Sequence, residues 1–231
     1  MSLARKSGWA LVLAVCMSAG AWAQGMRGGM GQRPPSMPGV FKPVVGSGAQ
    51  YEMDSKNHKT DIAWAVVGHE DVNGSPGYWM EIRTEGPETG GEMVMKQLVV
   101  LSSGGPDIKR MIMQSPGQPP MEMPMGMLSG VMASRAKAGQ ASSGEKGGGP
   151  GQLVGTESVT VPAGTFECEH FRKQEDKGTI DYWVSTQVSP YGVVKMTGPD
   201  MSMMLKKVLS GETSHITGEP QKLDIPGMPH Q

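Results

Sequence analysis

Methionine is the residue type in this chain with the clearest chemical signature. Four of the 21 methionines alternate along one short stretch, at Met121, Met123, Met125 and Met127. Thioethers are soft ligands, and Cu(I) prefers sulfur donors. The pattern therefore predicts a copper site as one alternative, while flexible methionines also suit contact with irregular apolar cargo or simple packing.

Cys168 and His170 extend the copper alternative, because residues two apart on a strand share a face. The same spacing argues against a catalytic pair in which the cysteine is the nucleophile and the histidine its base. The two side chains would lie about 7 Å apart, which is too far for a hydrogen bond. The chain has no Gly-x-Ser-x-Gly elbow, and His69-Glu70-Asp71 lacks the second histidine of a zinc-protease helix. We therefore expect no catalysis and, outside the copper alternative, no cofactor.

The first 23 residues carry the three parts of an export signal. Arg5 and Lys6 precede an apolar run over residues 9–15, and Ala21-Trp22-Ala23 supplies the small residues before the expected cleavage point after Ala23. The run is too short to span a bilayer, and no later run is long enough. We predict a periplasmic or secreted protein of the bacterial envelope with no transmembrane segment after signal removal.

The cysteines and the net charge bear on three further properties: lipid modification, disulfide bonds and nucleic-acid binding. Cys16 offers a lipoprotein interpretation of the signal, but Val15 disfavours it because a small residue is expected before a lipid-modified cysteine. Signal removal leaves Cys168 as the remaining cysteine, so we expect no internal disulfide. It also removes two cations, which changes the formal charge from −1 to −3, and no basic patch is dense enough to bind nucleic acid.

Glycine and proline, 34 and 18 residues respectively, divide the chain into segments. After the signal peptide over 1–23 we predict a flexible leader over 24–48. One β domain is expected over 49–217, with a flexible insert around 115–152. A tail over 218–231 completes the chain.

Short segments of alternating apolar and polar residues predict an antiparallel sheet as the dominant element. Turn residues separate them, among them Asn73-Gly74, which suits the positive φ of a hairpin. The ten expected strands cover 49–54, 60–68, 78–84, 92–101, 108–114, 155–161, 165–173, 179–185, 192–197 and 201–209.

Several of these strands are apolar on both sides, so the sheet needs cover on both faces. The helical spacing in 126–138, which includes Leu128 and Met132, predicts one short helix that could cover a face. We therefore expect a mainly β (α+β) domain, with a curved antiparallel sheet or half-open barrel and one short helix over a face.

Three segments in the second half of the domain form a recognisable pattern: Val-Thr-Val-Pro-Ala-Gly-Thr-Phe-Glu-Cys at 159–168, Asp-Tyr-Trp-Val-Ser at 181–185 and Val-Ser-Pro-Tyr-Gly-Val-Val-Lys at 188–195. The first half adds Tyr-Trp-Met-Glu at 78–81 and Ile-Lys-Arg-Met-Ile at 108–112. Together these segments, over about 49–210, resemble exported bacterial domains of unknown function that are related in pattern to the lipoprotein carriers LolA and LolB.

The resemblance implies a strongly curved half-open barrel with helices in its concave face, which in the carriers holds acyl chains. No residue-level site carries over, because the matched positions are turn residues and strand aromatics. We predict a non-catalytic binding protein for a lipid or other hydrophobic small molecule, with no identified protein partner. A Cu(I)-binding protein and an envelope scaffold without a small ligand stay open. The residues expected to line the ligand are Trp64, Trp79, Met93, Met95, Leu128 and Met132.

Overall fold

The computed structural model describes residues 41–55, 58–86, 90–102, 105–124, 151–175 and 178–222. All of them belong to one of two compact units of the chain, residues 37–231. These ranges contain strands and turns but no helix. Among the described residues there is accordingly no helix that could cross a membrane. The expected helix over 126–138 and the export signal lie outside the described residues.

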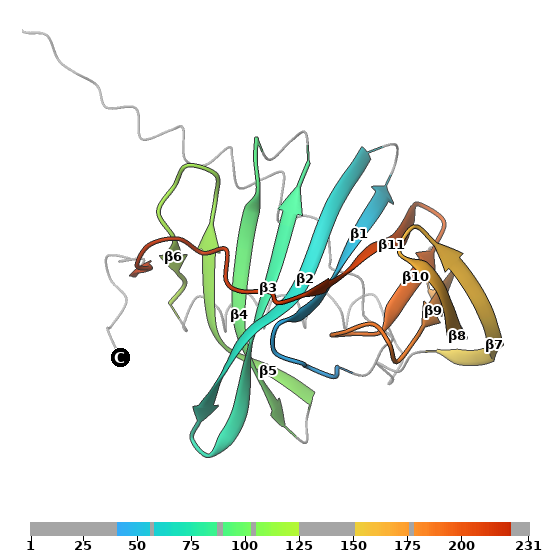
Figure 1. The fold of residues 1–231 in the computed structure, drawn as a ribbon, viewed down its shortest axis with the longest axis horizontal. Coiled ribbons are helices and arrows are strands. Elements are labelled where there is room, and N and C mark those ends of the chain that lie inside the picture. The colour runs from blue at the N-terminus through green and yellow to red at the C-terminus, as the bar shows by residue number, and fades with distance from the viewer. Residues whose placement is uncertain are drawn as a thin grey trace, which may run out of the picture. The chain divides into compact units, whose positions relative to one another are not determined.

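Within the described residues, twelve strands form one sheet with the order β12-β6-β5-β4-β3-β2-β1-β11-β10-β9-β8-β7 (Figure 1). Neighbouring strands are antiparallel, except that β6 and β12 run parallel. The strands are β1 (Ser47–Ser55), β2 (His58–Val72), β3 (Ser75–Glu85), β4 (Met93–Ser102), β5 (Gly105–Gln114), β6 (Met121–Glu122), β7 (Gln152–Val161), β8 (Gly164–Glu175), β9 (Gly178–Val184), β10 (Val193–Thr197), β11 (Met201–Ser210) and β12 (Gln221–Lys222).

All ten strands predicted from the sequence are confirmed, as β1 to β5 and β7 to β11. The Asn73-Gly74 hairpin is also confirmed: both residues have positive φ, 54° and 80°, and the Gly74 N–H donates to Asp71 Oδ1 at 2.8 Å. The structure adds β6 and β12, which lie in the expected insert and tail. Strands of two residues are too short to show an alternating pattern.

The half of the sheet that contains β7 to β11 curls on itself. Three strands separate β7 from β11 in the sheet order, yet the Ala163 N–H in the β7–β8 turn donates to Leu205 O of β11 at 3.3 Å. Strand twist and coiling permit such closure without an added layer. The predicted curvature is therefore present in this half of an otherwise open sheet.

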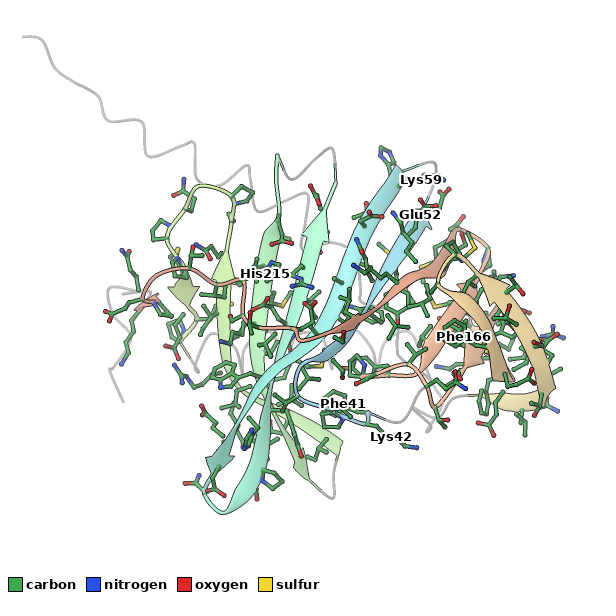
Figure 2. The ribbon with its side chains drawn as sticks, viewed as in Figure 1. Phe41, Lys42, Glu52, Lys59, Phe166 and His215 are labelled. Atoms are coloured by element: carbon green, nitrogen blue, oxygen red, sulfur yellow. The ribbon has the colours of Figure 1, made fainter. Side chains whose placement is uncertain are left out.

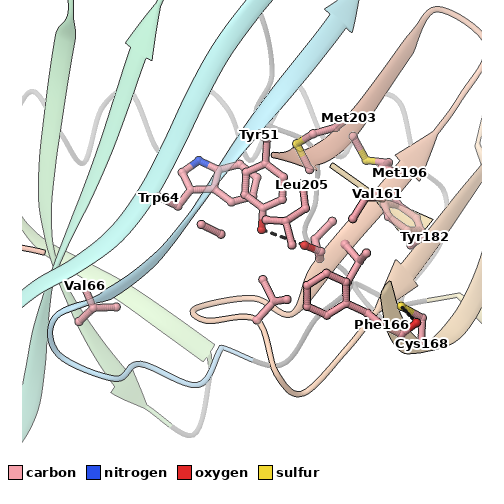
Figure 3. Close-up of a cluster of buried hydrophobic side chains, with 14 of the residues drawn as sticks. Tyr51, Trp64, Val66, Val161, Phe166, Cys168, Tyr182, Met196, Met203 and Leu205 are labelled. Carbon is pink, nitrogen blue, oxygen red and sulfur yellow. Dashed lines mark hydrogen bonds between the residues drawn. The ribbon is translucent and has the colours of Figure 1, made fainter. Parts of the chain in front are cut away.

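One face of the sheet, which we call the core face, carries Tyr51 and Trp64 with ring centroids 4.7 Å apart (Figure 3). The Tyr51 hydroxyl donates to Val193 O at 2.9 Å, and burial raises the pKa of Tyr51. The curled half is thus filled by its own side chains. The buried residues of this cluster are Ala49, Tyr51, Trp64, Val66, Met80, Val99, Val161, Phe166, Cys168, Tyr182, Val188, Val193, Val194, Met196, Met203 and Leu205.

Two further aromatic residues cover the core face over β2 and β3. Phe41 lies 5.2 Å from Tyr191 and 6.5 Å from Tyr78 between ring centroids. Tyr191 stands edge-on to Trp64 at 5.9 Å, and the Lys42 N–H donates to Pro190 O at 2.9 Å. The last residues of the expected leader therefore pack on the core.

Candidate functional site

A single row of cross-strand neighbours runs along the core face from the aromatic core to the β6 end of the sheet. Trp64 of β2 pairs with Ile82 of β3, and Ile82 pairs with Met95 of β4. Met95 pairs with Met113 of β5, which pairs with Met121 of β6. Directly paired residues share a face and have neighbouring Cβ atoms. We call Met95, Met113 and Met121 the methionine ladder.

The methionine ladder is half-buried, unlike the fully enclosed core methionines Met196 and Met203. The Gln97 Nε2 atom lies 3.5 Å from Met95 Sδ. Unbranched thioether side chains adapt to irregular apolar shapes, and their sulfur is also a soft donor. The ladder can therefore contact apolar groups or bind a soft cation, but it supplies no acid, base or nucleophile.

Two more methionines flank the ladder. Met111 is buried beside it and accepts the Met123 N–H at its carbonyl oxygen, 2.9 Å away. Met93 is half-buried and lies on the core face, because it pairs with Thr84, which stands on the same face as Ile82. The thioether surface is thus wider than the ladder itself.

The residues expected to line a ligand fall into three groups. Met93 and Met95 lie at the thioether surface, and Trp64 is 4 % exposed in the core at the other end of the same row. Trp79 is on the opposite face of β3. Leu128 and Met132 lie outside the described residues. The structure therefore brings three of the six onto one face, and their role as ligand contacts stays a prediction.

The Trp79 ring is surrounded by charged groups. Its indole N–H donates to Glu70 Oε2 at 2.9 Å. Lys96 Nζ and the Arg110 guanidinium stand 5.0 and 5.2 Å from the ring centroid, within cation–π range. Arg110 in turn makes two hydrogen bonds to the Glu122 carboxylate, at 2.7 and 3.1 Å. This environment suits a structural tryptophan better than contact with an acyl chain.

The residues of the copper alternative are not gathered in one place. Met121 and Met123 lie at and just after β6, while Cys168 and His170 belong to β8, near the other end of the sheet order. Met125 and Met127 lie outside the described residues. Across the part of the chain that is described, no group of three or more His, Cys, Asp or Glu could hold a metal ion. Thioethers are therefore the donors on which a copper site would depend.

Cys168 is a poor ligand or nucleophile where it stands. Its side chain is buried, and Sγ lies 3.5 Å from Phe166 O. Burial first, and then the nearby carboxylates of Glu167 and Glu157, raise the pKa of the Cys168 thiol to about 11. Because the thiolate is the reactive and metal-binding form, the residue stays inert at neutral pH.

His170 is held between two carboxylates on β7 and β9. Its Nδ1 lies 3.1 Å from Glu157 Oε1, and its Nε2 lies 2.7 Å from Asp181 Oδ1. The ring stacks on Trp183 with centroids 4.5 Å apart, and the Trp183 indole N–H donates to the same Glu157 oxygen at 2.6 Å. These contacts link three neighbouring strands, and we assign them a structural role.

This arrangement gives a pH-dependent prediction for Asp181. Burial acts to raise the pKa of Asp181, but hydrogen bonds from Arg172 and His170 outweigh it and lower the pKa. A carboxyl group whose pKa is lowered by folding contributes its full stabilisation at any pH above its unfolded-state pKa of about 4. That contribution is lost as the pH falls through the lower pKa of the folded state. In urea unfolding over a pH series, the stability advantage of wild type over Asp181→Asn should shrink below about pH 4. An advantage that stays constant into strong acid would contradict this assignment.

The C-terminal segment 211–220, which we call the strap, crosses the opposite face of the sheet, the strap face (Figures 1 and 2). There Glu81 is fully buried, and it accepts hydrogen bonds from Ser214 Oγ at 2.8 Å and from the His215 N–H at 3.0 and 3.1 Å. Lys96 Nζ donates to the same Ser214 hydroxyl at 3.2 Å. A buried carboxylate thus fixes the strap to β3 and β4.

Arg83 forms the second anchor of the strap. Its guanidinium donates to Glu212 Oε2 at 2.6 Å and to His215 Nε2, and its side chain is 7 % exposed. Because arginine only donates, Nε2 must accept, which leaves Nδ1–H to donate to Glu92 Oε1 at 2.8 Å. Both ring nitrogens of His215 therefore have partners, and a polar network links the strap to this face of the sheet.

Comparison with known proteins assigns the chain to no family. No family model and no curated protein matches it. It is similar to the solved structure of a proposed lipoprotein from Parabacteroides distasonis, with 11 % identity and a TM-score of 0.36 over 74 % of this chain and 98 % of that one. It is also similar to a proposed exported protein with a YmcC-like fold from Bacteroides fragilis, with 13 % identity and a TM-score of 0.33 over 74 % and 99 %. At this sequence identity and TM-score, the similarity supports no inference about function.

Proposed function

We propose that this is an exported, non-catalytic binding protein that holds an acyl chain or a similar apolar ligand against the methionine ladder. The observation that carries the proposal is the register that aligns three half-buried thioethers on adjacent strands. The export signal in the first 23 residues supports an envelope location. A protein in that compartment meets lipids directly.

The position of the ladder fits this role better than the curled half of the sheet does. The curled half is filled by buried side chains such as Phe166 and Leu205, so it has no need of a ligand. The ladder continues the same apolar row toward the β6 end of the sheet, and its own three side chains are only half-buried. Burying about 300 Å² of ligand surface there would contribute about 7 kcal/mol before ordering costs, enough for weak to micromolar binding.

Titration with a fluorescent fatty acid tests the proposal. Wild-type protein should bind saturably, and the triple variant Met95→Gln, Met113→Gln, Met121→Gln should bind at least about tenfold more weakly, because polar amides would replace the apolar contacts. Met204→Gln is the matched control, since Met204 is 36 % exposed on the strap face beside Glu52. Absence of saturable binding by wild type, or equal losses in both variants, would reject the proposal.

The same three sulfur atoms favour Cu(I) as a second candidate ligand, because three soft donors on neighbouring strands match its preference. The triple variant Met95→Leu, Met113→Leu, Met121→Leu separates the two candidates. It keeps the apolar surface but removes the sulfur, so fatty-acid binding should persist while any Cu(I) binding is lost. Cu(I) titration against a competing chelator provides the measurement. Cu(I) binding that survives in the leucine variant would exclude the ladder as its site.

A further inference from the structure

Gln97 is a polar residue on the core face, directly beside the methionine ladder. It is half-buried on β4, two positions after Met95, and it pairs with Met80 of β3 and Met111 of β5. Residues two apart on a strand share a face, as do residues paired across strands. Methionines therefore lie next to Gln97 along its own strand and on both neighbouring strands.

The carboxamide of Gln97 has more hydrogen-bonding capacity than its neighbours use. A glutamine side chain offers two N–H donors and one oxygen acceptor. Among the described residues, the one hydrogen bond of this side chain is the contact from Nε2 to Met95 Sδ at 3.5 Å. Thioether sulfur is a weak acceptor. A stronger acceptor brought to this position would therefore meet an available donor.

Tyr191 repeats this arrangement where the thioether surface meets the aromatic core. Its hydroxyl donates to Met80 Sδ at 3.3 Å, and Met80 is the residue paired with Gln97. Burial raises the pKa of Tyr191, so the hydroxyl remains a donor at neutral pH. Two side-chain donors beside the ladder thus have sulfur as their acceptor.

The charges of β3 to β6 that neighbour this region lie on the opposite face. Alternation and register place five of them on the strap face: Glu81, Arg83, Lys96, Arg110 and Glu122. The described residues that the same strands place around Gln97 on the core face are uncharged: Met80, Ile82, Met93, Met95, Met111, Met113 and Met121. A carboxylate buried among them would lose its hydration without a cation to compensate. A neutral carbonyl oxygen needs only a donor.

We propose that Gln97 selects acyl esters over free fatty acids, by donating a hydrogen bond to the ester carbonyl while the acyl chain lies along the methionine ladder. This inference rests on the function proposed above and adds the chemical class of the ligand. A free fatty acid can still place its chain on the ladder, but its carboxylate must stay in water, so less of the ligand is buried.

Titration with one fluorescent chain in two forms, the free fatty acid and its methyl ester, tests the inference. Wild type should bind both saturably and the ester more tightly. Gln97→Met removes the amide but keeps an unbranched side chain. It should weaken ester binding about tenfold and change fatty-acid binding by less than about twofold, because the lost hydrogen bond is made to the ester alone.

Gln50→Met is the matched control for this substitution. Gln50 is also half-buried, but it lies on the strap face, because it pairs with Ala63 and Ala63 pairs with Arg83. Both affinities should stay at the wild-type level in this variant. Circular dichroism confirms the fold of each variant.

The outcomes separate this inference from the function on which it rests. Saturable binding by wild type with no loss of ester affinity in Gln97→Met, or with equal losses for ester and acid, would overturn the role of Gln97 and leave the ladder as the binding surface. Absence of saturable binding of either form by wild type would overturn both.

Discussion

Replacing Trp64 with alanine is expected to lower the free energy of unfolding by about 3–5 kcal/mol, the range for removal of a large buried aromatic side chain. Trp64 is 4 % exposed, and its ring contacts Tyr51 at 4.7 Å and Tyr191 at 5.9 Å between centroids. The cavity would lie where the aromatic core meets the row that leads to the methionine ladder. Urea unfolding of wild type and variant gives the difference directly.

Trp183→Ala is the matched comparison. Trp183 is only half-buried, at the margin of the core cluster, and its ring stacks on His170. We expect its loss to cost about 1–2 kcal/mol, as for a partly exposed contact. Equal costs for the two tryptophans would mean that the core is not centred on Trp64.

Replacing Arg83 with methionine should cost about 3 kcal/mol, because removal of one partner of a buried ion pair leaves the other without compensation. Glu212 would lose the guanidinium that lies 2.6 Å from its carboxylate, and His215 would lose its donor. Glu81 would then be the remaining anchor of the strap on β3, so hydrogen exchange at the His215 N–H should accelerate along with the loss in unfolding free energy.

Arg110→Met is the control for this substitution. Arg110 also pairs with a glutamate on the strap face, but its side chain is 42 % exposed against 7 % for Arg83. An exposed pair contributes about 1 kcal/mol or less. If Arg83→Met costs no more than Arg110→Met, the strap is not held by its buried charges.

The strands could be predicted from the sequence because their signal is local. Alternation and turn residues such as Asn73-Gly74 lie within a few positions of each other. The strap could not be predicted in this way. Its attachment depends on Glu81 and Arg83 meeting Glu212 and His215, about 130 positions away, and no local pattern encodes such a contact.

The candidate site was predictable only in part, for the same reason. Alternation within β3 predicts that Trp79 and Met80 point to opposite faces of the sheet. Only the register with the neighbouring strands shows which of the two faces is the core face. The register also brings together Met95, Met113 and Met121, which belong to three different strands. The alternating run after residue 120 contributes Met121 to the ladder, while Met125 and Met127 lie outside the described residues.

The proposal that the ladder binds an apolar ligand is tested most directly by NMR of protein carrying ¹³C-labelled methionine methyl groups. On titration with a fatty acid, the methyl signals of the methionine ladder should shift saturably. Those of Met196 and Met203, which are 0 % and 1 % exposed in the curled half, should not move. Shifts confined to the buried methionines, or none at any methionine, would contradict the account.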